Sequence, residues 1–320
     1  MKTAIPTTGT KRTMNAIARA SALEDSPVDP GKLFLPEAFT PLYYTPAYGA
    51  LTPEQRRRYN QLHALYFNEQ ILYFETALGT RILESLRRQA WPDRMADGLR
   101  RFQEEERQHS AMFRRLNQRC APELYTGRDF YFVQVPKLWT AASNWAVARP
   151  RLFPLFLWLM LVQEERSLYY SRGILRHRES IEPNFVQAHR LHLADEMGHV
   201  RWDEELLDAL WQRSRPVLRR ANAKLFAWML GEFFSTPKRA QLRVVDELVR
   251  GFPELREWRP EMRRQVLALS ANDEYRTSLY SREIVPRTFA RFDATPELRA
   301  LKICGYLPRG PRGPQLEVVR

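Results

Sequence analysis

Three residues of types that bind transition metals recur at helical spacing near the middle of the chain. His192 and Glu196 are four positions apart, and His199 follows three positions later. Because an α-helix turns by about 100° per residue, these side chains are expected to lie on one face. Phe185 and Leu206 continue that face with apolar side chains, which indicates that it is buried. A buried carboxylate is costly unless it is paired, and a metal such as iron or manganese, bound by His and Glu, would pair it.

A second Glu-x-x-His motif lies at Glu106 and His109, within an apolar stripe that runs from Leu99 to Leu116. Two helices with Glu-x-x-His, together with two helices that each supply a single Glu, form the dinuclear site of ferritin-like bundles. The pattern therefore predicts an all-α protein: a ferritin-like four-helix bundle with additional helices.

The two single carboxylates should come from the helix before Glu106 and from a helix between the two motifs. In the earlier helix, Glu75 continues an apolar stripe more clearly than Glu69 does. In the later helix, Glu165 shares an apolar face, whereas the face of Glu164 is more polar. We therefore favour Glu75 and Glu165 as ligands over their neighbours.

Capping signals and prolines place the helices that position these residues. Thr52, Pro53 and Gln55 predict the start of the first helix, and Pro183 opens the fourth. The predicted helices are 52–88, 92–119, 138–177 with a break near the prolines at 150 and 154, 183–213, 215–234, 237–250 and 260–283, and a last short turn begins at 295.

The ends of the chain differ in composition from its centre. Residues 1–34 lack a periodic apolar pattern and predict a flexible N-terminal arm without a secretion signal. Residues 35–305 are expected to form the bundle domain, with an irregular Pro- and Tyr-rich strap at 35–50 and a loop at 121–137. Residues 306–320 are polar and rich in Pro and Gly, which is typical of a mobile tail.

Composition limits the classes of partner. The 50 Lys and Arg residues exceed the 37 acidic ones, giving a net charge of +13, but they are spread along every helix rather than gathered into a nucleic-acid motif. The apolar run 152–162 is too short to cross a membrane, which takes about 20 residues. Two distant cysteines, Cys120 and Cys304, imply no disulfide framework. We therefore expect a cytoplasmic protein that binds neither nucleic acid nor membrane.

The motifs together resemble the para-aminobenzoate N-oxygenase family of ferritin-like di-iron oxygenases, over roughly residues 50–285. His192 is the most telling residue, because ordinary ferritin-like enzymes have only Glu-x-x-His there. The additional histidine resembles the third histidine ligand that marks the family. Carried over residue by residue, the resemblance implies the ligands Glu75, Glu106, His109, Glu165, His192, Glu196 and His199.

The resemblance also implies an activity. Two iron ions, with manganese as a possible substitute, would activate O2 and oxygenate an amine nitrogen to the hydroxylamine, nitroso or nitro level, with no catalytic residue beyond the metal ligands. The implied partners are a small-molecule amine of secondary metabolism, O2 and an electron donor (a ferredoxin or a reductase), and the implied assembly is a homodimer. Asp203, and less favourably Asp195, are placed to orient a ligating imidazole.

Two other functions compete with this interpretation. One is a di-iron hydroxylase or desaturase that acts on an aliphatic or carrier-bound substrate. The other, from a different class, is a basic binding protein whose metal has no catalytic role.

Overall fold

The computed structural model describes residues 26–235 and 239–301, with side chains omitted for 233–235. Within this part, the chain forms helices and one isolated bridge between Leu33 and Ile181, without a strand. The all-α prediction is confirmed. In the same residues, no helix is long and apolar enough to cross a membrane.

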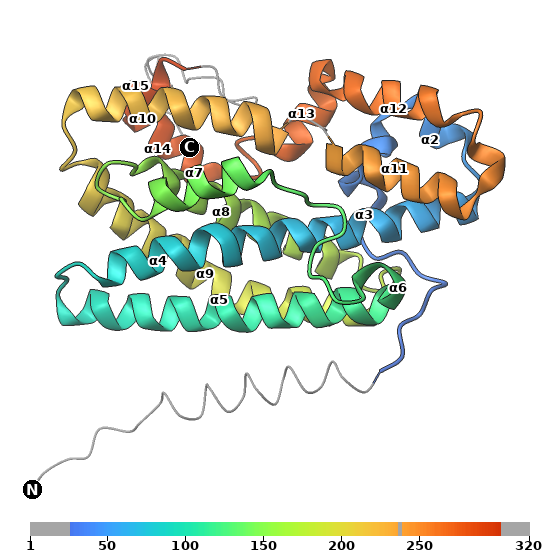
Figure 1. Ribbon diagram of the computed structural model, residues 1–320, viewed down its shortest axis with the longest axis horizontal. Coiled ribbons are helices and arrows are strands. Elements are labelled where there is room, and N and C mark those ends of the chain that lie inside the picture. Colours follow the sequence, from blue (N-terminus) through green and yellow to red (C-terminus); the bar gives the residue numbers. More distant parts are fainter. Residues whose placement is uncertain (1–25, 236–238, 302–320) are drawn as a thin grey trace, which may run out of the picture.

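Four long helical rods form the bundle (Figure 1). The first is α3 (Pro53–Tyr73), continued by the π-helical segment η3 (Phe74–Gly79) and by α4 (Thr80–Arg87). The others are α5 (Asp93–Cys120), α8 (Leu155–Arg176) and α9 (Pro183–Trp211). Helix α5 packs against both the first rod and α9, and α9 packs along α8, so the four rods enclose a common interior.

Local chemistry fixes the first rod as the sequence predicts. The Thr52 hydroxyl accepts a hydrogen bond from the Gln55 backbone N–H at 3.2 Å, and the Gln55 side chain accepts one from the Thr52 N–H at 2.9 Å. This reciprocal cap satisfies N–H groups that a helix start leaves unpaired, while Pro53 occupies the first position, where it loses no hydrogen bond.

The predicted break in the third helix is confirmed. Helix α7 (Lys137–Val147) ends before Pro150, and α8 begins directly after Pro154. A proline has no N–H to donate, so it is tolerated at a helix start and not within a helix.

Additional helices lie above α3 and α8 in the view of Figure 1, on the side away from α5. They are η1 (Glu37–Phe39), η2 (Pro41–Tyr44), α2 (Pro46–Ala50), α7, α10 (Pro216–Met229), η4 (Leu230–Ser235), α11 (Arg239–Gly251), η5 (Pro253–Leu255), α12 (Arg259–Ala268), η6 (Leu269–Ala271), α13 (Asp273–Leu279), α14 (Pro286–Ala294) and α15 (Pro296–Arg299). The small helix α6 (Pro122–Tyr125) lies elsewhere, at the end of α5.

Several of these elements differ from the prediction. The expected helix 260–283 is divided, because the Asn272 side chain caps α13 by accepting the Tyr275 N–H at 2.8 Å. Helix α14 lies in a segment for which the sequence predicted no helix. At the predicted boundary between arm and bundle, Phe34 is 3% exposed and stacks on Phe185. The rest of the arm up to residue 25, and the tail at 306–320, lie outside the described residues.

Candidate metal centre

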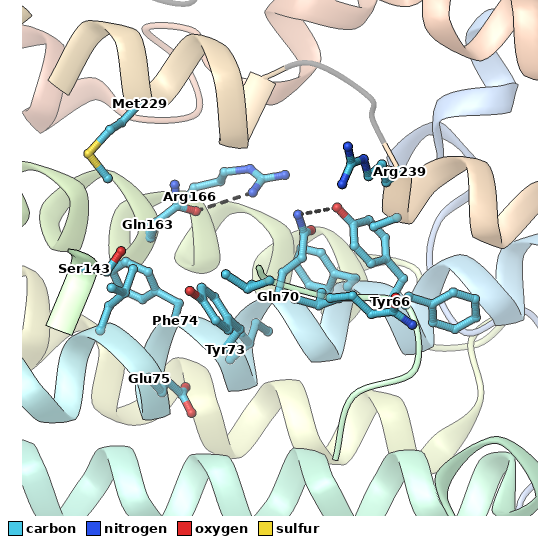
Figure 2. A pocket seen from close by; sticks show the side chains of 18 of the residues that line it. Tyr66, Gln70, Tyr73, Phe74, Glu75, Ser143, Gln163, Arg166, Met229 and Arg239 are labelled. Carbon is cyan, nitrogen blue, oxygen red and sulfur yellow. Dashed lines mark hydrogen bonds between the residues drawn. The ribbon is translucent and has the colours of Figure 1, made fainter. Parts of the chain in front are cut away.

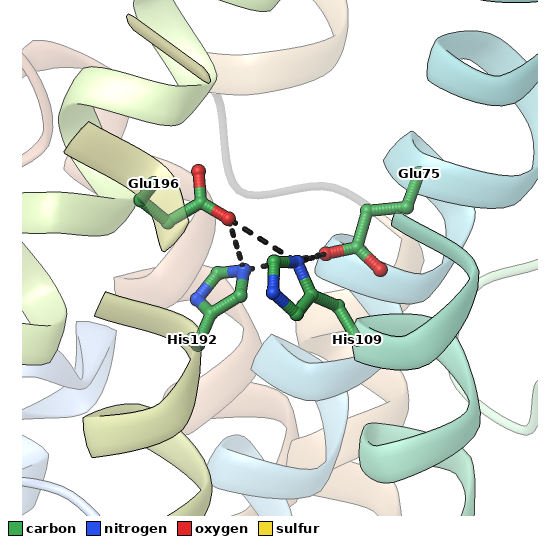
Figure 3. A group of neighbouring side chains, drawn as sticks. All are labelled: Glu75, His109, His192 and Glu196. Atoms are coloured by element: carbon green, nitrogen blue, oxygen red, sulfur yellow. Dashed lines mark hydrogen bonds and ion pairs between the residues drawn. The ribbon is translucent and has the colours of Figure 1, made fainter. Parts of the chain in front are cut away.

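Six of the seven side chains predicted as ligands meet between the four rods, and each is at most 4% exposed. Their ligand atoms form two overlapping groups, within each of which all the atoms lie within 4.8 Å of one another. The first group is Glu75, His109, His192 and Glu196, drawn in Figure 3. The second is Glu106, His109, Glu196 and His199. The two groups overlap at His109 and Glu196, and the carboxylate of Glu196 could bridge two ions, so the arrangement is compatible with a dinuclear site.

The first group is held by short contacts between helices. His192 Nε2 lies 2.7 Å from Glu196 Oε1 and 3.3 Å from Glu75 Oε1. His109 Nδ1 lies 3.4 Å from Glu196 Oε1 and 3.8 Å from Glu75 Oε1. Side chains from α5, α9 and η3 therefore converge on one point (Figure 3).

The second group contains buried polar atoms that the protein itself does not satisfy. His199 Nδ1 lies 3.1 Å from Glu106 Oε1 and 3.5 Å from Glu196 Oε1. Yet among the described residues, His109 Nδ1, His199 Nδ1, Glu106 Oε1 and both Glu196 oxygens are buried without a hydrogen bond of normal geometry. Buried polar atoms are nearly always hydrogen-bonded. These nitrogen and carboxylate oxygen atoms therefore fit metal ions between them.

Charges within the cluster support the same reading. Burial opposes ionisation of Glu196, but His192 and His199 hold its pKa well below the usual value. Burial likewise opposes a charge on His192, but Glu196 and Glu75 raise its pKa to about 10. Glu196 and His192 thus favour each other's charged forms, and a metal bound at His192 Nε2 would displace its proton.

Glu165, which the sequence favoured as a ligand, lies outside both groups and has other partners. Its Oε1 accepts the Arg287 backbone N–H at 2.7 Å and its Oε2 accepts the Thr288 N–H at 2.8 Å. These are among the first N–H groups of α14, where unpaired donors and the helix dipole favour a carboxylate. Both oxygens of Glu165 are therefore occupied away from the histidines.

Glu164, the alternative to Glu165, is the residue of the pair that lies near the cluster. Its side chain is buried and borders the same cavity as Glu75 and His192. Burial, followed by the carboxylates of Glu196 and Glu106, raises the pKa of Glu164 well above the usual value. A carboxylate this close to two others needs a cation to remain ionised.

Glu69, the alternative to Glu75, has a structural role instead. Its carboxylate accepts backbone N–H groups of Tyr131, Phe132 and Val133 at 2.7–2.9 Å and the Tyr125 hydroxyl at 2.7 Å. It thereby fixes the loop that follows α6.

The π-helical segment η3 places Glu75. A π-helix is rare, and single π-turns occur frequently at functional sites. Glu75 Oε2 accepts a hydrogen bond from the Ser110 hydroxyl at 2.9 Å, which leaves Oε1 directed at His192.

The outer nitrogens of the histidines have their own partners. His109 Nε2 lies 3.3 Å from Asp195 Oδ2, and His199 Nε2 lies 3.1 Å from Glu105 Oε2. His192 Nδ1 lies 3.2 Å from the hydroxyl of Ser167. Such contacts fix which nitrogen is free to bind a metal.

The preference for Asp203 over Asp195 as an orienting residue was wrong. The Asp203 side chain is fully buried, and neither of its oxygens has a hydrogen-bond partner among the described residues. Glu105 and Ser167 were missed, because their contacts cross between helices and leave no periodic signal in the sequence.

A cavity of about 470 Å³ opens beside the cluster (Figure 2). Glu75, Glu164 and His192 border it, and apolar side chains such as Phe74 and Trp139 line its walls. A volume of this size, mostly apolar with a few polar groups, is typical of small-molecule sites.

Comparison with known proteins agrees with this geometry. The family described as P-aminobenzoate N-oxygenase AurF matches residues 23–273, a range that includes every side chain of the cluster. No curated protein matches the chain.

Proposed function

The chain belongs to the P-aminobenzoate N-oxygenase AurF family, which implies an oxygenase that acts on a small molecule with O2, and we propose that it is a di-iron N-oxygenase of amines. The observation that carries the proposal is the pair of overlapping His and Glu groups in the bundle interior. We propose products at the hydroxylamine, nitroso or nitro level and a role in secondary metabolism.

We propose that the metal ligands are Glu75, Glu106, His109, Glu164, His192, Glu196 and His199. Imidazole and carboxylate donors suit iron, with manganese as a substitute, and the set contains no thiolate that would favour zinc. When bound, the iron pair supplies the redox chemistry that activates O2 and delivers oxygen to the substrate.

The protein's own residues determine which side of the metals the substrate reaches. Glu75, Glu164 and His192 border the cavity, so an amine nitrogen approaches the centre from this side. Apolar walls around Phe74 exclude water from the reacting atoms. Asp195 is partly exposed and contacts His109 Nε2 at 3.3 Å, which fixes the orientation of that imidazole.

The third histidine gives the site its distinctive donor set. His192 adds a neutral donor where a further carboxylate would add negative charge, and Ser167 fixes its orientation. We propose that this lower negative charge directs oxygen to an amine nitrogen rather than to a C–H bond. An external donor, a ferredoxin or a reductase, would supply electrons, and we propose a homodimer as the assembly.

Iron loading followed by turnover tests the proposal. The metal-free protein is titrated with Fe(II) under argon, and bound iron is expected to reach two per chain. Exposure to O2 with a panel of aryl and aliphatic amines should then yield the hydroxylamine, nitroso or nitro compound, with one or two oxygen atoms on nitrogen that 18O2 labels. Labelling of carbon instead of nitrogen, or no O2-dependent product from any amine while iron is bound, would contradict the proposal.

A further inference from the structure

The guanidinium of Arg166 is a buried cation that borders the cavity. The residue is 8% exposed and borders the cavity, and the hydrogen bonds of its side chain among the described residues go to neutral groups. Its Nε has no hydrogen-bond partner, and its other contacts are long, at 3.5 Å each to the Gln163 side chain and the Tyr170 hydroxyl. The charge is therefore only weakly compensated by the protein.

Aromatic rings keep this cation in place without neutralising it. The Arg166 guanidinium lies over the rings of Tyr170 and Tyr280, at 4.8 and 5.3 Å from their centroids. Cation–π contacts recover only part of the cost of burying an ion that has no counter-ion. An anion from outside the chain would supply the remainder.

The cavity provides the place for such an anion. Figure 2 shows Arg166 and Arg239 across the cavity from Glu75, with Tyr66 and Gln70 joined by a hydrogen bond of 2.8 Å in the same region. Arg243 also lines the cavity. One part of the wall therefore carries arginines, and another carries the proposed metal ligands.

We propose that Arg166 binds an anionic group of the substrate, a carboxylate or a phosphate, while the substrate's amine nitrogen lies at the metal centre. This inference rests on the proposed function. A guanidinium can donate two parallel hydrogen bonds to either kind of anion. A cavity of about 150 Å³ is enough for benzene, so about 470 Å³ holds a substrate larger than a single ring.

Binding to the iron-loaded protein without O2 tests this, because no turnover is needed. The probes are matched pairs: 4-aminobenzoate with 4-aminobenzamide, and 4′-aminobiphenyl-4-carboxylate with its amide. A third acid, 4-aminophenyl phosphate, separates phosphate from carboxylate as the preferred anion. Calorimetry should show at least one acid binding at least about 30-fold more tightly than the neutral amide, since loss of one partner of a buried charge pair has an effect of this size or larger.

Variants identify the residue responsible. Arg166→Gln should reduce the preference for the acid to near unity, and Arg166→Lys should keep a several-fold preference, because it retains the charge but loses the paired donors. Arg172→Gln, an exposed position on the same helix, should leave the preference unchanged. Melting temperature and iron content identify any variant that has not folded. If Arg166→Gln has not folded, the preference of Arg166→Lys for acid over amide is the measurement that tests the inference.

Two results would overturn the inference. One is equal binding of acids and amides by the unchanged protein. The other concerns Arg166→Gln. The inference is wrong if this variant keeps the preference for acids. It is also wrong if the variant loses affinity for acid and amide equally and melts at a lower temperature, because that result is expected when the arginine has only a structural role. Either result leaves N-oxygenation of a neutral amine possible, and a preference for acids would stand even if no amine were oxygenated.

Discussion

Glu164 and Glu165 are adjacent, yet replacing each by glutamine should cause different defects: loss of stability at Glu165 and loss of iron binding at Glu164. In Glu165→Gln, one of the two oxygens that accept N–H groups of α14 becomes an NH2 group, and the negative charge at the helix N-terminus is lost. Caps and helix-dipole contacts of this kind contribute about 1–2 kcal/mol. We expect the free energy of unfolding to fall by about that amount and the melting temperature by a few degrees. Iron binding should be retained.

In Glu164→Gln, the expected defect is in metal binding. Without metal, the raised pKa of Glu164 already favours its neutral form, so a neutral glutamine should leave the metal-free protein about as stable as the unchanged one. Loss of a residue that merely orients a metal ligand lowers affinity by about 10–100-fold. Loss of a ligand itself should therefore weaken iron binding by about 100-fold or more.

Two measurements on each variant separate these effects. Anaerobic titration with Fe(II) gives the iron stoichiometry and affinity, and denaturant unfolding of the metal-free protein gives stability. The reasoning is refuted if Glu165→Gln loses iron while Glu164→Gln binds it normally. It is also refuted if both variants bind iron normally and differ in stability alone, because α8 would then supply no ligand.

Other substitutions test the remaining assignments. His192→Ala should abolish N-oxygenation of amines while the chain still folds, which product analysis and circular dichroism would show; unchanged N-oxygenation would reject the role of the third histidine. Asp195→Asn should weaken iron binding by about 10-fold, whereas Asp203→Asn, which breaks no hydrogen bond, should not, and titration with Fe(II) compares the two. Burial lowers the pKa of His63 to about 3. In the unfolded chain the pKa is about 6.5, so folding favours the neutral ring. The free energy of unfolding is therefore unaffected by this group above pH 6.5 and falls as the pH drops towards 3. Denaturant unfolding measures the free energy of unfolding at pH 8 and at pH 5. The decrease in that free energy between the two pH values should be about 2 kcal/mol smaller in His63→Gln than in the unchanged protein.

The sequence predicted best what a single helix determines by itself. The spacing of His192, Glu196 and His199 fixes their common face whatever surrounds α9, and the same holds for Glu106 and His109 on α5. The start of α3 is likewise local, because its cap uses residues within one turn. Burial of these faces follows from their apolar neighbours.

The sequence failed where one helix depends on another. We preferred the apolar face of α8, but the polar face is the one that meets the histidines, where Ser167 contacts His192. The apolar face packs on α14 instead, and Trp158 contacts Phe292 there. Since α14 was not predicted, nothing in the sequence showed that its backbone N–H groups would donate hydrogen bonds to Glu165. The contact between Glu105 and His199 was hidden for the same reason, because it joins α5 to α9.

Two features of the interior make sense only with ligands bound. Five His and Glu atoms of the centre lie buried without normal hydrogen bonds among the described residues, and Arg166 lies buried without a carboxylate partner there. Well-packed apolar residues commonly stabilise a fold as much as buried charges do, or more, so neither feature is explained as a device for stability. Each becomes favourable when an ion of opposite charge arrives, a metal cation at the centre and a substrate anion at Arg166. Since both border one cavity, the same substrate can contact the two at once, which fixes the amine nitrogen at the metals.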